Sequence, residues 1–485
     1  MPFLRRRPVT AEVLIVGAGA AGLMLGIELA RRGVAFRLID KLAASFAGSR
    51  GKGIQPRTQE IFEDIGILDR VVALGGRYPI QREYRADGTV AEDEMMANDP
   101  PTPAEPYRIP LMVPQFLTER AMRERLAELG HAPAFGCELT RFKQDKDGVT
   151  ATLSTGETIR ARTLIGADGG RSVVRHALKI DFPGKTLGVR AVVADVMLTG
   201  LPRDAWHRFN EGSMAQQMSL CPLMGTDMFQ LQAPIPLEGD VDLSADGLDR
   251  MVRARTGRDD IRIASVSWAS AFNMNARLAD RYRAGRVFLV GDAAHVHPPT
   301  GGQGLNTSIQ DAYNLGWKLA AVLRGAPDAL LDSYEDERRP VAAAMLGLAT
   351  KLLDAAMRGD MRRGREVHQL DIGYPDSPLA FEAPRREDGL FAGDRAPDAP
   401  IRGAAGQPQR LFDLFQGPHW TLLGDGIAPR AGLRIHTPGK DIFDDAGHLR
   451  AAYGDATVLI RPDGYVGAIV QDAATLEPYL RKVGL

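Results

Sequence analysis

The sequence contains few cysteines and almost no excess charge. Cys137 and Cys221 are its only cysteines and no CxxC pair occurs, which excludes a disulfide framework and fits a reducing compartment. The formal net charge of −1 excludes the basic footprint of nucleic-acid binding, and Arg5–Arg7 is interpreted as a solvated tail. No apolar run approaches the length of a membrane span, and no signal-peptide pattern opens the chain. We therefore expect a cytoplasmic protein that binds neither nucleic acid nor membrane.

The remaining composition is that of an ordinary globular protein. The chain has 485 residues, of which 44% are hydrophobic and 25% charged, and this length predicts two or three domains. Between residues 188 and 272 apolar and polar residues alternate with a period of two, which predicts an antiparallel sheet. Its methionines either line a pocket for a large flat substrate or fill the core, and both interpretations stay open. They are Met214, Met218, Met224 and Met228.

A strand, a glycine-rich turn and a helix near the N-terminus predict a dinucleotide-binding unit. Residues 12–16 form a short apolar strand, GAGAAG follows at 17–22, and a helical pattern runs to Arg32 before Gly33. The first glycine permits the tight turn, the second lets the backbone approach a pyrophosphate, and the third allows close helix packing. The next strand ends in Asp40, whose carboxylate can bind ribose hydroxyls. An acid at this position favours FAD or NAD over NADP.

Residues 286–320 are the most informative segment of the chain. A hydrophobic strand over 287–290 ends in Gly291 and Asp292, a proline- and glycine-rich loop follows, and a helix is predicted to begin near Asn306. This order places a carboxylate at the end of a strand and free backbone N–H groups at the start of a helix. Asp168 follows a further predicted strand in the same way. Together with GAGAAG, these acids predict a three-point site for one flavin.

Helix boundaries and surface charges give further expectations. A helix over 118–129 is predicted to begin with Thr118 as its N-cap. A long helix over 328–357 contains Pro340, which should kink it, and Arg338 on this helix is expected on a solvated face.

Two longer motifs carry a family resemblance. GADGGRSVVR (166–175) and GDAAHVHPPTGGQGLN (291–306), read with GAGAAG, resemble the class A FAD-dependent aromatic hydroxylases of the para-hydroxybenzoate hydroxylase superfamily, over most of residues 10–350. Beyond residue 390, AGDRAPDAPI, WTLLGD and LIRPDGYVG are similar to the C-terminal thioredoxin-like domain of the phenol hydroxylase, aromatic-polyketide hydroxylase and rifampicin monooxygenase type. Without CxxC this domain cannot perform dithiol chemistry, so a structural or oligomerisation role is expected, with a homodimer as one option.

The resemblance implies an α/β fold with a Rossmann-like FAD-binding domain, an inserted antiparallel-sheet substrate domain and a thioredoxin-like domain. We expect the FAD-binding domain to comprise residues 1–180 and 273–371, with 74–114 contributing to the substrate domain at 181–272. A linker at 372–408 and the thioredoxin-like domain at 409–485 would follow.

The resemblance also implies roles for individual residues. The GAGAAG segment would lie along the pyrophosphate, with Asp40 and Lys41 at the adenosine ribose, and Leu139 would offer its backbone to adenine. Gln115 would contact the ribityl–phosphate region, Asp292 the ribityl chain or pyrophosphate, and the loop from Pro299 the isoalloxazine. Two departures from the family are Ala20, where relatives often have proline, and Lys52, which would alter substrate contacts. The expected cofactor-binding residues are Gly17, Gly19, Ala20, Ala21, Gly22, Asp40, Lys41, Arg50, Gln115, Leu139, Asp168, Asp292, Pro299, Gly302, Gln303, Gly304, Leu305 and Asn306.

The implied reaction is hydroxylation of a phenolic or polycyclic aromatic substrate. NAD(P)H would reduce FAD, O₂ would add at flavin C4a, and the resulting hydroperoxide would transfer oxygen to the ring. Because GxGxxG occurs once, NAD(P)H is expected to dock transiently rather than in a second nucleotide-binding domain. Arg50 is the one catalytic candidate, and its simpler role is phosphate binding.

Other interpretations remain open. A flavin-dependent reductase or dehydrogenase on the same fold and a non-catalytic FAD-binding protein are the alternatives. Flavin halogenation is disfavoured because the tryptophans are isolated. His295 and His297 form an HxH pair, but no third ligand is arranged beside it, so no metal site is expected.

Overall fold

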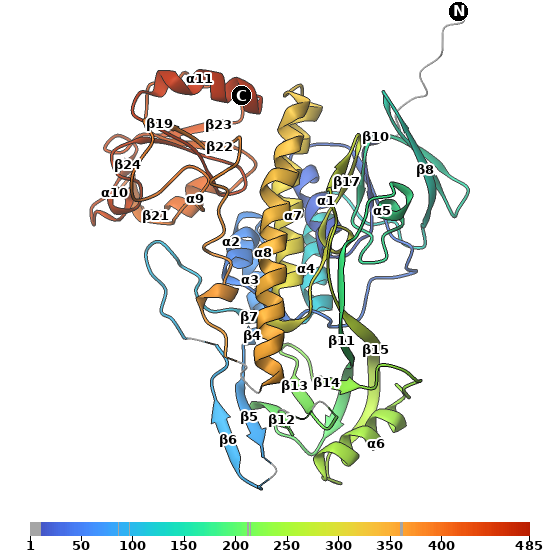
Figure 1. The fold of residues 1–485 in the computed structure, drawn as a ribbon. Coiled ribbons are helices and arrows are strands. Elements are labelled where there is room, and N and C mark those ends of the chain that lie inside the picture. The colour runs from blue at the N-terminus through green and yellow to red at the C-terminus, as the bar shows by residue number, and fades with distance from the viewer. Residues whose placement is uncertain (1–10, 86, 97, 211–212, 214, 359–361) are drawn as a thin grey trace, which may run out of the picture.

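A mixed sheet with a parallel centre organises the first part of the chain. The computed structural model describes residues 11–85, 87–96, 98–210, 213, 215–358 and 362–485, and it has a mixed α/β fold (Figure 1). Arg5–Arg7 and Met214 lie outside these residues. The strands of the first sheet are β1 (Ala11–Val16), β2 (Phe36–Ile39), β8 (Leu139–Asp145), β9 (Gly148–Leu153), β10 (Thr158–Gly166), β16 (Arg283–Ala284) and β17 (Val287–Leu289). Strands β17, β10, β1 and β2 run parallel in that order, and the β8–β9 hairpin extends from β10. The two parallel partners of β1 therefore place the ends of β2 and β10 beside its own end.

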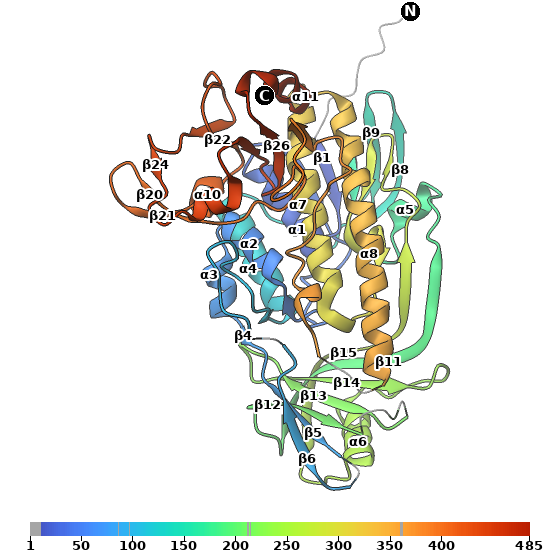
Figure 2. The ribbon, with the colours of Figure 1, turned by 60° about the vertical axis from the view of Figure 1, so that its left-hand side comes forward.

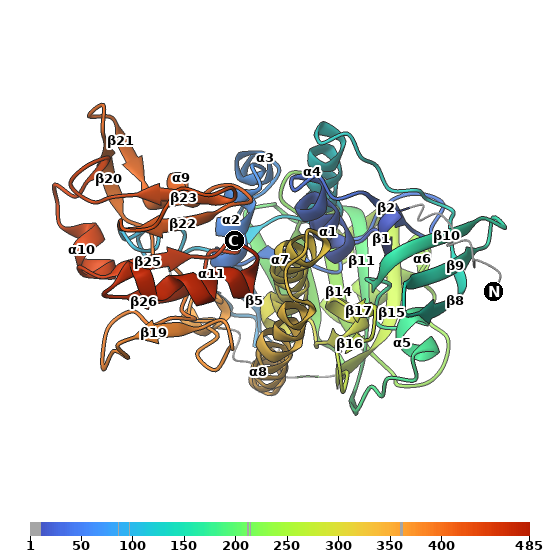
Figure 3. The same cartoon turned by 90° about the horizontal axis from the view of Figure 1, so that it is seen from above.

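Helices cover this sheet and bury its apolar side chains. They are α1 (Ala20–Ala30), α2 (Pro56–Asp64), α3 (Leu68–Ala73), α4 (Gln115–Glu128), α5 (Val173–Ala177), α7 (Gln303–Leu323) and α8 (Asp332–Met357). Figure 3 shows α1, α4 and α7 between the sheet and the C-terminal strands. The core joins Leu14 and Ile15 of β1 to Leu23 of α1 and Ile309 of α7, all fully buried. A continuous hydrophobic core thus fixes the start of α7 relative to the strand ends.

Two helix expectations are corrected. Helix α4 begins at Gln115 after Pro114, so Thr118 lies inside the helix and not at its cap. Arg338 is fully buried, because a carboxylate on α7 binds it, and so the expected solvated face is wrong there. Helix α8 is one helix with Pro340 inside it.

A second sheet lies at the opposite end of the molecule from the C-terminal strands (Figure 2). Its strands are β5 (Ile80–Tyr84), β6 (Val90–Asp93), β11 (Gly184–Thr199), β12 (Ala205–Phe209), β13 (Met218–Pro222), β14 (Phe229–Ile235), β15 (Arg262–Leu278) and β18 (His295–Val296). The order is β18-β15-β11-β14-β13-β12-β5-β6, antiparallel except where β12 runs parallel to β5. Helix α6 (Ala245–Thr256), which the alternating pattern did not predict, packs on this sheet through Leu248 and Val252. Met218 is buried in this sheet's core and Met224 is half-buried, so core filling accounts for Met218.

Two small sheets and a C-terminal sheet complete the chain. The C-terminal sheet contains β19 (Phe381–Ala383), β22 (Trp420–Leu423), β23 (Leu433–His436), β25 (Thr457–Ile460) and β26 (Val466–Val470) in the order β19-β26-β25-β22-β23. The small sheets are β3 (Gly53–Ile54), β4 (Gly76–Arg77) and β7 (Leu111–Met112), and β20 (Pro400–Gly403), β21 (Pro408–Arg410) and β24 (Ile442–Phe443). The helices of this part are α9 (Leu411–Phe415), α10 (His448–Tyr453) and α11 (Glu477–Val483). Residues 372–408, expected as a linker, contain β19 and β20, because the apolar pieces around Phe381 and Ile401 pair with strands of the C-terminal part.

One helix passes a simple test for a membrane span. Among the described residues, Asp328–Met357 is long and apolar enough by length and composition, although no run in the sequence was expected to be. Its Glu337 and Arg338 are buried and bind charged partners from other elements. Such partners are typical of a core helix.

Candidate functional site

Four parallel strands end at one edge of the first sheet, and a predicted site residue follows each of them. Gly17 follows β1 and Asp40 follows β2, while Asp168 and Asp292 come after β10 and β17. The amide of Ala167 donates to the carbonyl of Val16 over 2.8 Å and that of Gly17 to Ile39 over 2.7 Å. The structure therefore brings the three predicted motifs together at the carboxyl ends of the strands, where nucleotides bind in sheets of this kind.

The turn after β1 requires glycine at two positions. Gly17 has φ +107°, and a Cβ there would lie 2.2 Å from the carbonyl oxygen of Ala167. A Cβ on Gly22 would lie 1.9 Å from the carbonyl oxygen of Gly17. Gly19 is different, because the nearest atom to an added Cβ is a Glu119 carboxylate oxygen at 3.8 Å. The start of α1 therefore stays accessible to a phosphate, while Ala20 and Ala21 are buried in the helix.

Asp40 holds the glycine-rich turn in place. Its Oδ2 accepts a hydrogen bond from the amide of Ala18 over 2.7 Å, and its Oδ1 accepts from the amide of Leu42 over 2.8 Å. Asp40 is half-buried and Lys41 is exposed, so both can reach a ligand. Leu139, at the start of β8, is buried and pairs with Leu153.

Glu119 is a residue that the sequence analysis missed. It is 1% exposed, and burial raises its pKa to about 7, while hydrogen bonds from Gln115 and the amide of Ala20 act in the opposite direction. The side-chain amide of Gln115 donates to its Oε1 over 2.8 Å. A glutamate four residues after Gln115 shares a helix face with it, which is a signal that the sequence did contain. Glu119 therefore places an ionisable carboxyl beside the start of α1.

The loop after β10 is tied to the loop after β17 by one arginine. The guanidinium of Arg175 donates to the carbonyl oxygens of Ala293 and Gly170, each over 2.8 Å. Ser172 caps α5 by accepting from the amide of Arg175 over 2.9 Å. Asp168 accepts from the amide of Val174 through Oδ2 over 3.1 Å, but its buried Oδ1 has no hydrogen-bond partner among the described residues. An orphaned acceptor at this position suits a hydroxyl donor from a ligand.

Asp292, the acid that follows β17, combines exposure to solvent with a raised pKa. Its side chain is exposed to solvent, yet the surrounding protein raises its pKa by desolvation, and the positive charges of His295 and Arg50 oppose that shift. No described residue donates a hydrogen bond to it. The chain thus leaves this carboxylate available to a ligand.

A buried ionic network supports the segment that carries Asp292. His295 Nε2 lies 2.6 Å from Asp311 Oδ2, and Arg338 Nε donates to Asp311 Oδ1 over 2.8 Å. The amide of Gly291 also donates to Asp311, over 3.2 Å. Burial alone would raise the pKa of Asp311, but the charges of His295 and Arg338 outweigh it and lower the pKa. His295 is therefore bound to Asp311, and its neighbour His297 is a buried base whose pKa burial lowers to about 3.

The start of α7 presents a left-handed glycine turn. Gly301 and Gly302 have φ +81° and +64°. Asn306 accepts from the amide of Gln55 over 2.9 Å and donates to the carbonyl of Gly53 over 2.9 Å, so its side chain fastens the turn to β3. The buried Gln303 side chain points into the protein and donates to the carbonyl of Val367. Exposed Pro299 and half-buried Gly304 and Leu305 remain to contact a ligand at this end.

Arg50 lies over two aromatic rings, one from its own loop and one from β15 of the second sheet. Its guanidinium carbon is 5.5 Å from the ring centre of Phe46 and 5.7 Å from that of Trp268. The next residue, Gly51, donates to Gln115 Oε1 over 3.1 Å. The loop that carries Arg50 therefore bridges the second sheet and α4.

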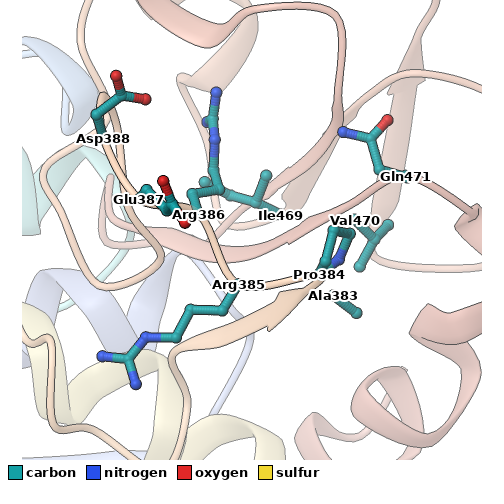
Figure 4. Close-up of a pocket in the computed structure, with 9 residues that line it drawn as sticks. All are labelled: Ala383, Pro384, Arg385, Arg386, Glu387, Asp388, Ile469, Val470 and Gln471. Carbon is teal, nitrogen blue, oxygen red and sulfur yellow. The ribbon is translucent and has the colours of Figure 1, made fainter.

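A separate hollow of about 250 Å³ lies in the C-terminal part (Figure 4). Its lining comes from the end of β19, the loop after it and β26, and none of the predicted site residues belongs to it. It is therefore distinct from the site at the strand ends.

The comparison with known proteins points to FAD, the cofactor that the strand-end motifs predict. A model described as an FAD binding domain matches residues 10–349. The chain belongs to this FAD binding domain family. This flavoprotein is 42% identical over 484 residues to a flavin-dependent monooxygenase of Mycobacteroides abscessus, covering 97% of this chain and 99% of the relative. It is 37% identical to a rifampicin monooxygenase of Streptomyces venezuelae, covering 94% of each.

Solved structures extend the likeness to the whole fold of the flavoprotein. The flavin-dependent monooxygenase PieE, in complex with FAD and substrate, has a TM-score of 0.84 at 26% identity and covers 98% of both chains. Aklavinone-11 hydroxylase, in a ternary complex with FAD and aklavinone, has a TM-score of 0.81 at 28% identity and covers 99% of both chains.

Proposed function

We propose that this flavoprotein uses NAD(P)H and O₂ to hydroxylate a phenolic or polycyclic aromatic substrate. The single observation that carries the proposal is the available carboxylate of Asp292 at the meeting point of three glycine-rich loops. The relatives that match over almost the full length are named flavin-dependent monooxygenases and rifampicin monooxygenases. When bound, FAD supplies the redox chemistry by which oxygen is activated.

The residues at the strand ends fit FAD. The accessible start of α1 suits the pyrophosphate, with Asp40 and Lys41 at the adenosine ribose and the backbone of Leu139 at adenine. Asp292 would accept hydrogen bonds from the ribityl chain or lie at the pyrophosphate. The glycine turn at Gly302–Gly304, next to Pro299 and Leu305, frames the isoalloxazine, and Arg50 interacts with phosphate or substrate. The backbone N–H groups at the start of α7 would favour negative charge on the isoalloxazine ring.

The second sheet supplies the substrate side. The relatives include aklavinone-11 hydroxylase and anhydrotetracycline monooxygenase, whose names refer to polycyclic compounds. Trp268 on β15 and the Arg50 loop lie against each other, so the sheet faces the proposed flavin ring end.

The domain assignments are part of the proposal. The parallel order β17-β10-β1-β2 supports a Rossmann-like FAD-binding domain. In the C-terminal sheet β22 is parallel to β23 and antiparallel to β25, an arrangement that supports a thioredoxin-like domain. We propose a structural role for that domain, transient docking of NAD(P)H, a cytoplasmic location, and a homodimer as one oligomeric form.

Substrate-stimulated turnover tests the proposal. The purified holoprotein would be given NADH or NADPH with a panel of phenols and polycyclic aromatics while reduced cofactor and O₂ are followed. We expect a substrate to accelerate the consumption of the reduced nicotinamide and the consumption of O₂ together. Turnover of an alkene without O₂ consumption would indicate a reductase or dehydrogenase instead. Bound FAD with no turnover of any compound would indicate a non-catalytic FAD-binding protein.

A further inference from the structure

Lys52 is a buried cation without a paired anion. Its side chain is 9% exposed, and its enclosed Nζ has no nitrogen or oxygen hydrogen-bond partner among the described residues, while the Cys221 thiol acts on it as a weak hydrogen-bond partner. No ion pair involving Lys52 occurs in the part of the chain that the structure describes. Burying an ammonium group without a paired acceptor costs several kcal/mol in proteins. This cost is comparable to the net free energy of unfolding of a domain. Such a cost points to a partner that the chain itself does not supply.

The surroundings of the Lys52 ammonium are aromatic and sulfur-rich. Nζ lies 4.0 Å from the ring centre of Trp206 on β12. Trp206 packs with Cys221, Met95 and Met112 in one buried cluster. Burial lowers the pKa of Lys52, while the charge and hydrogen bond of Cys221 and the charge of Asp195 act in the opposite direction. An ammonium group whose neighbours are an aromatic ring and sulfur atoms suits an aromatic ligand that carries a negatively charged oxygen.

These side chains continue a row across the second sheet. Trp268 pairs with Asp195, Asp195 with Gln230, and Gln230 with Cys221, so the four share one face of β15, β11, β14 and β13. Asp195 and Gln230 are already occupied, because the carboxylate accepts from the amide of Ser49 over 2.8 Å and the Gln230 amide donates to the Ser49 hydroxyl over 2.7 Å. Asp195 and Gln230 thus hold the loop before Lys52, and Nζ is left with the Cys221 thiol, a weak acceptor, in this row.

The backbone of Lys52 connects this face to the proposed flavin end. Its carbonyl accepts from the amide of Val113 over 2.8 Å. On one side Gly51 lies against Leu305, since a Cβ there would be 3.5 Å from the Leu305 Cβ, and on the other the Gly53 carbonyl accepts from Asn306. The main chain at Lys52 is therefore held at the start of α7 while the side chain reaches the sheet.

We propose that Lys52 is a specificity-determining residue whose ammonium binds a phenolate-type oxygen of the aromatic substrate, beside Trp206. This inference rests on the proposed function and names the substrate class of that same site as an ionised phenol. Lys52 orients the ring and does not itself take part in bond making.

Ligand binding to the oxidised holoprotein tests the assignment without turnover. Pentachlorophenol, ionised at neutral pH, and its O-methyl ether would be titrated while the flavin absorbance spectrum is recorded. We expect the wild type to bind the phenol more tightly than the ether. Lys52→Met should weaken phenol binding roughly tenfold to a hundredfold, since a charge-assisted hydrogen bond is lost, and leave ether binding unchanged. Lys52→Arg should keep part of the preference, and Lys185→Met, which removes an exposed lysine of β11, should keep all of it.

Thermal unfolding without ligand separates this role from a structural one. Lys52→Met should retain FAD and unfold at a higher temperature than the wild type, because an unpaired buried charge is removed. A variant that unfolds at a lower temperature would assign Lys52 to the fold and overturn the proposal. Equal affinity of Lys52→Met and the wild type for pentachlorophenol, or no preference of the wild type for the phenol over the ether, would overturn it as well. Failure of the proposed monooxygenase function would appear separately, as absent O₂ consumption in a protein that still shows the Lys52-dependent preference.

Discussion

Asp292 is the residue on which the cofactor assignment depends most. Its carboxylate is accessible, desolvated and without a protein donor, so replacing it removes an acceptor without breaking an internal bond. We predict that Asp292→Ala purifies as folded protein with FAD affinity reduced about tenfold or more, the loss expected for a charged hydrogen-bond acceptor. Flavin fluorescence on dilution measures this affinity. Asp227→Ala, at an exposed loop of the second sheet, is the matched control, and normal FAD affinity of Asp292→Ala would contradict the site assignment.

Glu119, beside the start of α1, makes the stability of the protein depend on pH. Burial raises its pKa to about 7, so the stability linked to this carboxyl is present below the ordinary glutamate pKa and is lost as the pH rises through about 7. We predict that Glu119→Gln stabilises the apoprotein at pH 8 by up to about 3 kcal/mol and has little effect at pH 5. Denaturant unfolding at both pH values checks this. An equal effect at both would show that Glu119 does not titrate in this range.

Sequence patterns predicted the positions of residues that follow strands, but not the contacts between residues that meet through the fold. Gly17, Asp40 and Asp292 were predictable because a glycine turn and a strand-terminal acid are local features. Asp311 and Arg338 were not, because they lie 27 residues apart on different helices and touch only when α7 and α8 pack. The expected solvated face for Arg338 was wrong for the same reason.

At the scale of elements, the start of α7 depends on the Asp311 network. The pKa of Asp311 is lowered, so its contribution to stability is present above the ordinary carboxyl pKa near 4 and is lost as the pH falls through its lower folded value. We predict that Asp311→Asn costs roughly 3–5 kcal/mol at neutral pH, as breaking a buried ion pair does, and flattens the acid limb of the stability curve. Circular-dichroism melts between pH 3 and pH 7 measure both effects. An acid limb unchanged from the wild type would assign the acid sensitivity to other groups.

The sequence predicted long periodic elements better than short paired ones. Strand β1 and helix α7 follow from apolar periodicity and glycine placement. Strand β19 was hidden in a proline- and glycine-rich segment, because three residues become a strand only when β26 lies beside them. Helix α4 begins at Gln115, three residues before Thr118, because Pro114 takes the N-cap position.

At the scale of the whole molecule, a buried ionic cluster joins the C-terminal sheet to helices α7 and α8. Arg461, in the turn after β25, donates to Glu337 of α8 over 2.7 and 2.9 Å, and Trp317 of α7 donates to Asp463 over 2.9 Å. Lys318 Nζ also donates to Glu337, over 2.6 Å. All of these groups are buried, so the cluster joins the two parts as a fixed contact.

Breaking this cluster should loosen the flavoprotein as a unit. We predict that Arg461→Met destabilises the protein by roughly 3–5 kcal/mol, because Glu337 and Asp463 lose a buried partner. It should also speed FAD release, because α7 carries the glycine turn. Thermal unfolding and FAD fluorescence measure the two effects. Arg450→Met, which breaks the exposed pair with Asp455 in the same part of the chain, should change neither. Destabilisation with unchanged FAD release would confine the cluster's role to the fold.

The central claim, that this flavoprotein transfers one oxygen atom from O₂ to an aromatic ring, is tested most directly by isotope labelling. The FAD-loaded protein would be incubated with NADH or NADPH and the aromatic panel under ¹⁸O₂, and the products would be analysed by mass spectrometry. We predict a hydroxylated product that carries one ¹⁸O atom and forms only with both FAD and reduced nicotinamide present. A product whose new oxygen comes from water, or substrate-dependent NAD(P)H oxidation that yields no oxygenated product from any compound, would contradict the account.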